Sequence, residues 1–449
     1  MIINRNILSK LKEWKNRSAR KPLIIRGARQ VGKTTVVTEF AKHYKYRIFL
    51  NLEKTKDRAY FTNEMDAKSI LESLFLYNNI DLLEMNNTLV FIDEIQESPY
   101  AIQILRYFYE EFPDLNVIAA GSLLEFAIKK VKSFPVGRIE YLYIHPINFE
   151  EFVAIKNDKL LEHLCNVPIN PIAHHILMEQ FNIYAIIGGM PEVVKEYIEN
   201  DSFTSLPRIY ESIWSTYKND VEKYTSSSTA KNVIKHIMST AHLYLDKRVK
   251  FQNFGNSNYR SREVGEAMRN LNDARIIQLI YPTINIEFPI IADLKKSPRL
   301  QFLDTGLVNH ALNIQSEMIG LKDLSNSYKG AIIPHLITQE LISLNSEKDN
   351  KPNFWVREKT QSSSEVDLLI SYKNMLIPIE IKSGATGSLK SLHQFIDRTN
   401  HHYAIRIYGG DFKIEKTKTP NKTPYYLMNL PYYLGTKIEK HIEYFINSY

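Results

Sequence analysis

Eight residues near the start of the sequence have the types and spacing of a loop that binds phosphate. Residues 27–34 read GARQVGKT and match G-x-x-x-x-G-K-[ST] between an apolar run and a helical pattern. Gly27 and Gly32 let main-chain N–H groups surround a phosphate, and the helix start adds partial positive charge. Lys33 would reach the β- and γ-phosphates, and Thr34 would bind Mg²⁺. The alternative is a chance match in a basic loop, against which the strand–loop–helix context argues.

A second acidic strand end is needed beside such a loop. Residues 89–94, LVFIDE, supply four apolar residues followed by Asp93 and Glu94. Asp93 would hold Mg²⁺, partly through water, and Glu94 would polarise the attacking water as a general base. The alternative interpretation is an acidic pair that starts a helix after a core strand.

Two further polar residues follow the next predicted strands. Ser122 ends NVIAAGS and is expected beside the γ-phosphate, although Ser122 and Glu125 could equally form a capping box. Arg138 in FPVGRIE is a candidate arginine finger, and a surface arginine on a strand is the alternative. The complete set of predicted nucleotide-binding residues is Gly27, Ala28, Arg29, Gln30, Val31, Gly32, Lys33, Thr34, Thr35 and Ser122.

Combined, these segments resemble a known family. GARQVGKT, LVFIDEIQ, IAAGS, FPVGR, GGMPEVV (188–194) and YKNDVEKY (217–224) are similar to the AAA-class ATPases of bacteria and archaea that carry an uncharacterised C-terminal region similar to restriction endonucleases. The resemblance implies a helical lid, a winged helix and a nuclease-like C-terminal domain, with Arg138 as the finger. The segment 247–268 departs from the winged-helix pattern, which argues against a direct DNA-reading role for it.

A second group of charged residues lies in the C-terminal third. Asp367 in SEVDLLI and Glu380 with Lys382 in LIPIEIKSG are predicted on neighbouring strands, as in the PD-(D/E)xK nuclease core. Two carboxylates there could bind Mg²⁺, and Lys382 could orient the attacking water. Glu340, on an apolar helix stripe, is expected to join them because a carboxylate facing a core needs a partner. The alternative is an internal Glu380–Lys382 ion pair in a domain without catalysis.

The elements that position these residues alternate between strand and helix. Apolar runs at 22–26, 46–52, 88–93 and 116–121, with helices at 33–44 and 99–111, predict an α/β fold with a buried parallel sheet. The predicted architecture is a three-layer αβα P-loop ATPase core (1–146), a helical lid (147–225), a degenerate winged-helix-like domain (226–312) and a C-terminal α/β nuclease-like domain (313–449). In the last domain we expect helices at 330–345 and 388–398 and strands at 353–357, 365–370, 375–382 and 402–407.

Composition limits the possible partners. With 57 Lys and Arg against 50 Asp and Glu, the net charge of +7 allows DNA as a partner without requiring it. No stretch approaches the ~20 apolar residues of a membrane span, and the one cysteine, Cys165, excludes internal disulfides, so we expect a cytoplasmic protein. The predicted cofactors are ATP and Mg²⁺, with a homo-oligomer possible. Two hypotheses remain: ATP turnover controls a C-terminal nuclease, or the chain is a nucleotide switch whose C-terminal domain only docks a protein or nucleic acid.

Overall fold

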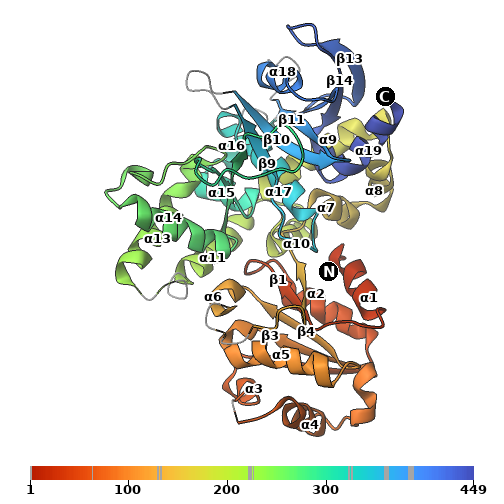
Figure 1. Cartoon of the computed structure of the whole chain (residues 1–449), viewed down its shortest axis with the longest axis vertical. Coiled ribbons are helices and arrows are strands. Elements are labelled where there is room, and N and C mark those ends of the chain that lie inside the picture. Colours follow the sequence, from red (N-terminus) through yellow and green to blue (C-terminus); the bar gives the residue numbers. More distant parts are fainter. Residues whose placement is uncertain are drawn as a thin grey trace.

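The computed structural model describes residues 3–62, 64–128, 131, 134–220, 225, 227–321, 324, 327–357, 364–382 and 389–449. The last four residues of YKNDVEKY and the end of LIPIEIKSG lie outside these ranges. A lower body built on a parallel sheet carries a larger upper body that holds a second sheet (Figure 1).

The lower body is built on a five-stranded sheet whose strands are all parallel. The strand order is β2-β3-β4-β1-β5, so β4 separates the strand before the phosphate loop from the strand that ends in Asp93. Both carboxyl ends therefore face the same edge of the sheet. The strands are β1 (Leu23–Arg26), β2 (Tyr46–Asn51), β3 (Thr88–Asp93), β4 (Asn116–Gly121) and β5 (Glu140–Tyr143).

Side-chain alternation along these strands explains the helices on both faces. On β3, Leu89 and Phe91 pack into the core beneath α1 and α2, whereas Val90 and Ile92 pack into the core beneath α4 and α5. The predicted three-layer αβα core is confirmed. Its helices are α1 (Ile7–Lys15), α2 (Lys33–Phe40), α3 (Thr55–Arg58), α4 (Ala67–Tyr77), α5 (Pro99–Glu111) and α6 (Leu124–Ile128), with 3₁₀ turns η1 (Ala41–His43), η2 (Leu82–Asn87) and η3 (Ile95–Glu97).

A helical region follows β5, as the sequence predicts. The GGMP loop at 188–191 separates α9 from α10, and the first turn of α10 lies beside the phosphate loop. The helices are α7 (Phe149–Lys156), α8 (Asp158–Cys165), α9 (His174–Ile187), α10 (Pro191–Asn200) and α11 (Leu206–Asn219), with η4 (Pro171–Ala173) before α9.

The next segment combines two long helices with a small sheet. Helices α13 (Ser228–Thr240) and α14 (Ser261–Asp273) pack on each other at one side of the molecule (Figure 1). The antiparallel strands β6 (Ile277–Ile280) and β8 (Arg299–Phe302) follow, while β7 (Pro282–Thr283) between them joins the large C-terminal sheet. Two 3₁₀ turns, η5 (Ala241–Tyr244) and η6 (Phe254–Asn256), connect the helices.

The C-terminal sheet is mixed and has seven strands in the order β13-β14-β12-β11-β10-β9-β7. Its hairpin β10–β11 is antiparallel, as expected, with Leu368 opposite Ile379. The strands from β9 on are β9 (Asn353–Val356), β10 (Glu365–Tyr372), β11 (Met375–Ile381), β12 (Tyr403–Tyr408), β13 (Lys413–Lys418) and β14 (Pro424–Pro431). The helices and 3₁₀ turns are α15 (Thr305–Leu312), α16 (Gln315–Met318), η7 (Ser327–Gly330), α17 (Ile332–Ser343), α18 (Lys390–Ile396), η8 (Tyr432–Lys437) and α19 (Ile438–Ser448).

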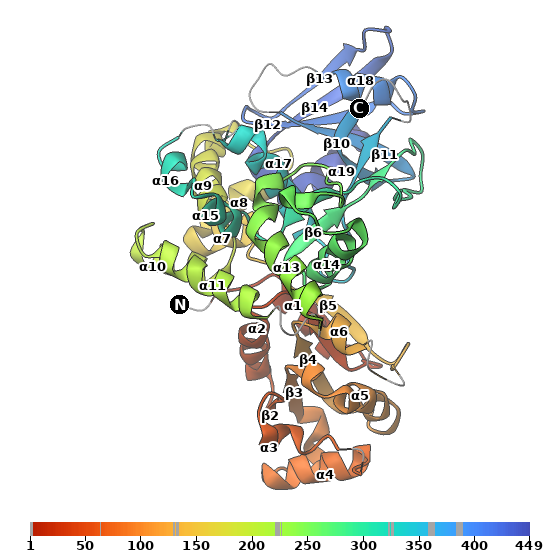
Figure 2. The same ribbon diagram turned by 90° about the vertical axis from the view of Figure 1, so that its left-hand side faces the viewer.

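One hydrophobic core runs through both bodies. It begins at Ile7 beneath the parallel sheet, passes through helices α7 to α11 and ends at Phe445 on α19. The lower body is the narrow end of the molecule in the side view (Figure 2). Across the described ranges, every helix is too short or too polar to cross a lipid bilayer.

Candidate nucleotide-binding site

The loop after β1 has the backbone conformation that its sequence predicts. Gln30 has a φ of 63° and Gly32 a φ of 94°, so both have a left-handed backbone conformation. Glycine adopts this conformation without steric cost, which explains the glycine at position 32. Gly27 is needed for another reason, since a Cβ there would lie 2.5 Å from the carbonyl oxygen of Ile144. The loop thus packs against the end of β5 and delivers the chain to the start of α2 at Lys33.

Lys33 is buried at the first position of α2. Its Nζ donates hydrogen bonds to the carbonyl oxygens of Gly27 (3.1 Å) and Ala28 (2.8 Å), inside the curve of the loop. Burial lowers the pKa of Lys33 to about 8, although the charges of Glu94 and Asp93 act in the opposite direction. A phosphate placed in this loop would add negative charge beside the ammonium group and favour its protonated form.

Thr34 and Asp93 meet at the edge of the sheet. The Thr34 hydroxyl donates to Oδ2 of Asp93 at 2.7 Å, and the main-chain N–H of Glu94 donates to Oδ1 at 3.0 Å. Burial raises the pKa of Asp93, while the Thr34 hydrogen bond opposes the shift. A hydroxyl and a carboxylate are the hard oxygen donors that Mg²⁺ prefers, so this pair fits the predicted ion.

Glu94 and Ser122 complete the predicted arrangement at this edge. Glu94 follows β3 with a φ of 51°, and its Oε2 accepts a hydrogen bond of 2.5 Å from the Gln96 amide. Ser122 is buried, and the Nε of Arg29 lies 3.4 Å from its Oγ. Glu125, the partner of Ser122 in the alternative capping box, instead forms an ion pair with Arg26 at 3.3 Å.

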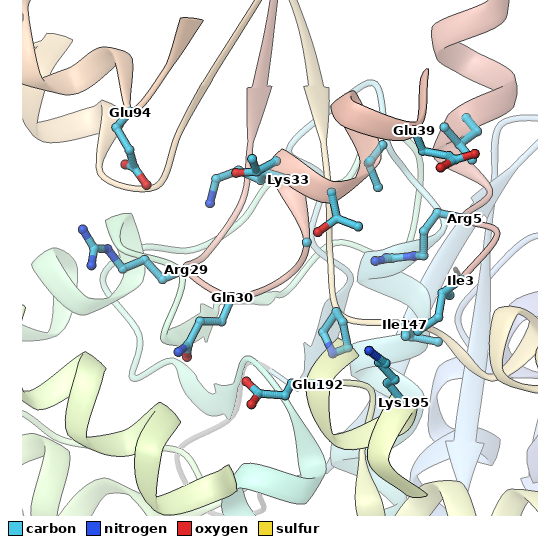
Figure 3. A pocket seen from close by; sticks show the side chains of 16 residues that line it. Ile3, Arg5, Arg29, Gln30, Lys33, Glu39, Glu94, Ile147, Glu192 and Lys195 are labelled. Atoms are coloured by element: carbon cyan, nitrogen blue, oxygen red, sulfur yellow. The ribbon is translucent and has the colours of Figure 1, made fainter. Parts of the chain in front are cut away.

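A cavity of about 470 Å³ opens over the phosphate loop. Figure 3 shows Lys33, Arg29 and Glu94 toward one end of it and Arg5, Ile3 and Lys195 toward the other. The lining comes from the N-terminal segment, the loop with α2, the end of β3, Ile147 and the first turns of α10. These residues are Ile3, Arg5, Leu8, Arg29, Gln30, Gly32, Lys33, Thr34, Thr35, Val36, Glu39, Glu94, Ile147, Pro191, Glu192 and Lys195.

Sequence reasoning missed the residues that reach this cavity from distant segments. Arg5 is buried, donates to the carbonyl oxygens of Val31 (3.1 Å) and His145 (2.7 Å), and pairs with Glu151 at 3.1 Å. It therefore joins the N-terminal segment, the phosphate loop and helix α7. Arg5 matches no motif, so nothing in the residues around it indicates this role.

Arg138 lies outside the lining of this cavity. It sits in the turn before β5, is exposed, and its Nε bonds to Oε1 of Glu110 at 3.0 Å. Its predicted role as an arginine finger stays a prediction.

The C-terminal carboxylates are only partly brought together. The Asp367 carboxylate accepts from the N–H of Ile381 at 2.8 Å, and Glu380 pairs with Lys382 at 2.5 Å. Burial raises the pKa of Glu380 to about 7, and the neighbouring Asp367 charge adds to the shift. From β8, Arg299 donates to the carbonyl oxygen of Asp367 at 3.0 Å.

Glu340 does not join that group, which corrects the sequence expectation. Its carboxylate faces α7 and α9, where it accepts hydrogen bonds from the Tyr184 hydroxyl (2.7 Å) and the Phe149 N–H (3.0 Å). The apolar stripe of α17 correctly indicated burial, but the partner comes from another domain. Among the residues that the structure describes, no three His, Cys, Asp or Glu side chains are grouped closely enough to hold a metal ion.

Comparison with known proteins agrees with the geometry of the phosphate loop. Residues 19–153 match the family described as an AAA domain, and residues 178–318 and 329–429 match two domains of unknown function, DUF8612 and DUF4143. Two solved structures are similar at low identity. The Walker-type ATPase paby2304 of Pyrococcus abyssi is 17% identical, over 69% of this chain and 96% of that chain, with a TM-score of 0.45. The FIGL-1 AAA domain is 16% identical, over 36% and 59%, with a TM-score of 0.22.

No curated protein matches the chain. The AAA-domain match covers the phosphate loop, Asp93, Glu94 and Ser122, which the fold brings to one edge of the parallel sheet. The match and this geometry together support an ATP-binding P-loop ATPase.

Proposed function

We propose that the chain is a Mg²⁺-dependent ATPase whose nucleotide state controls its C-terminal domain. Lys33 would bind the β- and γ-phosphates, and Thr34 with Asp93 would hold the ion that offsets phosphate charge. Glu94 would take a proton from the attacking water. The observation that carries the proposal is the 2.7 Å contact between Thr34 and Asp93 beside the buried Lys33.

The segments between the phosphate-binding core and the C-terminal domain would also have roles in this function. Residues 147–225 would act as a helical lid, because Pro191, Glu192 and Lys195 line the cavity from α10. Residues 226–312 would form a winged-helix-like domain, with α13 and α14 before the two strands β6 and β8. Arg138, exposed in its turn, would serve a neighbouring subunit if the chain forms a homo-oligomer in the cytoplasm.

Measured ATPase activity and nucleotide affinity test this function. Wild-type protein is expected to bind ATP and release phosphate only with Mg²⁺, and Lys33→Ala to lose nearly all of that activity. The matched control is Lys42→Ala. Lys42 is an exposed lysine just after the end of α2, and it pairs with Glu39 on that helix. Failure of wild-type protein to bind ATP would overturn the proposal. Stimulation of turnover by added DNA would favour a DNA-directed function.

A second candidate concerns the C-terminal domain, which the sequence left open between a nuclease and a docking module. The separate position of Glu340 favours docking, because its carboxylate already has hydrogen-bond partners on α7 and α9 and is absent from the predicted nuclease group. Glu380 pairs with Lys382 through one of its carboxylate oxygens. We therefore propose the docking module as the alternative to a DNA-cleaving domain. Such a module would bind its protein or nucleic-acid partner in one nucleotide state.

The variant Lys382→Ala distinguishes the two. A docking module predicts that neither wild-type protein nor the variant cuts DNA or RNA with Mg²⁺ or Mn²⁺. A nuclease predicts cleavage by wild-type protein that Lys382→Ala abolishes. Lys373→Ala, at an exposed lysine in the turn of the same hairpin, is the control.

A further inference from the structure

Arg29 is the third residue of the phosphate loop and has a long cationic side chain that the loop pattern does not require. It lines the nucleotide cavity. Figure 3 shows its guanidinium toward the end of the cavity where Lys33 and Glu94 also lie. The charge of Arg29 is one of the influences that lower the pKa of Lys33, so the two cations lie within electrostatic range of each other. The cations Arg29 and Lys33 and the Glu94 carboxylate thus lie at the same end of the nucleotide cavity.

The Arg29 side chain is held in place from three sides. Its Nε lies 3.0 Å from Oδ2 of Asp220 and 3.4 Å from Oγ of Ser122, and an Nη lies 3.4 Å from Oε1 of Glu53. Asp220 is buried, so its contact with Arg29 is shielded from solvent. The side chain keeps part of its surface exposed, at 22%.

The main chain of Arg29 is fixed as well. The hydroxyl of Tyr217, on the last turns of α11, donates to its carbonyl oxygen at 2.9 Å. Tyr217 and Asp220 therefore clamp one loop residue by its backbone and its side chain. A guanidinium that is already oriented needs little rearrangement to bind a new oxygen atom.

Resting on the proposed function, we propose that Arg29 is a catalytic arginine supplied by the phosphate loop itself, which binds the γ-phosphoryl oxygens as charge develops on them, and that Asp220 is its positioning residue. This differs from the sequence expectation, which assigned that chemistry to Arg138. Arg138 is bonded to Glu110 and does not line the cavity, whereas Arg29 does.

The chemical step is a hydrolysis. A water oxygen forms a bond to the γ-phosphorus, and the bond from that phosphorus to the β–γ bridging oxygen breaks, with its electron pair leaving on ADP. The water proton passes to Glu94. Negative charge builds up on the departing bridging oxygen and the γ-phosphoryl oxygens, and the N–H groups of Arg29 and the ammonium of Lys33 would donate to these atoms.

The experiment compares Arg29→Ala, Arg29→Lys and Asp220→Asn with wild-type protein. Removing one donor that acts on the transition state is expected to lower kcat by about 10²–10³-fold. Arg29→Lys keeps the charge but loses the planar pair of donors, and Asp220→Asn keeps the guanidinium but weakens its orientation. The kcat of both variants should therefore lie between the values of wild type and Arg29→Ala. Arg106→Ala, which removes another arginine paired with Glu110, is the control and should match wild type.

Affinity measurements distinguish a catalytic role of Arg29 from a purely structural one. ADP alone lacks the γ-phosphoryl group, whereas ADP with aluminium fluoride places a mimic of the transferring phosphoryl group beside it. Arg29→Ala is expected to keep its affinity for ADP and to lose affinity for the fluoride complex. The proposal is overturned if kcat stays at the wild-type value, or if both affinities fall equally. Lys33→Ala, measured in parallel, shows independently whether the cavity binds nucleotide.

Discussion

Glu340 illustrates how a single residue can connect two domains. It is fully enclosed on α17, yet its two oxygens accept hydrogen bonds from Tyr184 on α9 and from the first residue of α7. Burial raises the pKa of Glu340 to about 8, and the charges of Glu151 and Glu150 add to the shift. The shift favours the neutral form of this carboxyl group at pH 7 in the folded chain.

This shift makes stability depend on pH in a defined direction. The carboxyl ionises near its ordinary pKa of 4.5 in the unfolded chain and near 8 in the folded chain. Between these values the folded chain binds more protons, so the free energy of unfolding falls as pH rises, by about 1.4 kcal/mol for each pH unit of full effect. Glu340→Gln cannot ionise and should lack this contribution. Urea unfolding of the wild type and of Glu340→Gln from pH 5 to pH 8 measures the free energy of unfolding of each protein. The same pH dependence in both proteins would contradict the prediction.

At the residue scale, local motifs were predictable and distant partners were not. Thr34 and Asp93 each belong to a motif that the sequence shows, and the structure brings them within 2.7 Å of each other. Arg5 and the Asp220 partner of Arg29 depend on contacts between segments more than a hundred residues apart. One sequence carries no spacing rule for such pairs.

Helix α11 links three separate segments through one of its faces. Tyr210, Trp214 and Tyr217 are four and three residues apart, which places them on the same side of the helix. They donate to the carbonyl oxygens of Ile187 (2.7 Å), Leu307 (3.1 Å) and Arg29 (2.9 Å) respectively. A shift of the phosphate loop would therefore move α11 and change the contact between Trp214 and α15.

Trp214 should report nucleotide binding by its fluorescence. In protein carrying Trp14→Phe and Trp355→Phe, Trp214 is the one tryptophan that remains of three. ATP is expected to shift its emission, because indole emission depends on hydrogen bonding and local polarity. Tyr217→Phe should reduce the shift while ATP still binds, since only the link to the loop is lost. An unchanged shift in that variant would show that α11 does not carry the signal, and Lys33→Ala provides the control without binding.

At the scale of elements, apolar runs with clear breaks gave accurate boundaries. The four predicted strands of the parallel sheet match β1 to β4 within one residue, and the hairpin at 365–382 is confirmed. Strand β5 was not predicted because its sequence, EYLY, is short and partly polar. Strands β13 and β14 were also missed. The first reads KIEKTK at the edge of the sheet, where no buried face imposes an apolar pattern.

At the scale of the whole molecule, three main-chain segments approach one another closely at Gly188, Gly189 and Gly306. Gly189 receives a hydrogen bond from the N–H of Ile147 (2.7 Å) and donates to Asp304 (2.6 Å) at the start of α15. A Cβ on Gly306 would overlap the carbonyl group of Ile187. The segments around Ile147, Gly188 and Gly306 therefore meet where an added Cβ would not fit.

Gly306→Ala should destabilise the whole chain by about 1–3 kcal/mol or more, because the backbone has no room to absorb the added methyl group. Gly137→Ala is the control: Gly137 has a φ of 74° and no atom within 4 Å of the added Cβ, so its cost is about 1–2 kcal/mol from the backbone alone. Urea unfolding measures both. A smaller loss for Gly306→Ala than for Gly137→Ala would mean that the junction is loose.

The three-layer core could be predicted at this scale, but the junctions between domains could not. Gly188, Gly189 and Gly306 are three of only 16 glycines in the chain, but the sequence alone does not indicate which backbone segments they bring together. The continuous hydrophobic core from Ile7 to Phe445 likewise depends on side chains that meet only after the chain has folded.

Strand β7 has a consequence for anyone who wishes to cut this protein into pieces. It lies at 282–283, well before the helices that open the C-terminal third, yet it pairs with β9 as the outer strand of the seven-stranded sheet. A fragment that starts at residue 313 would leave the backbone of β9 bare along one side and prone to pair with another molecule. An expressible C-terminal piece should therefore begin upstream of Pro282, and gene fusions that exchange this part between relatives should place their crossover there as well.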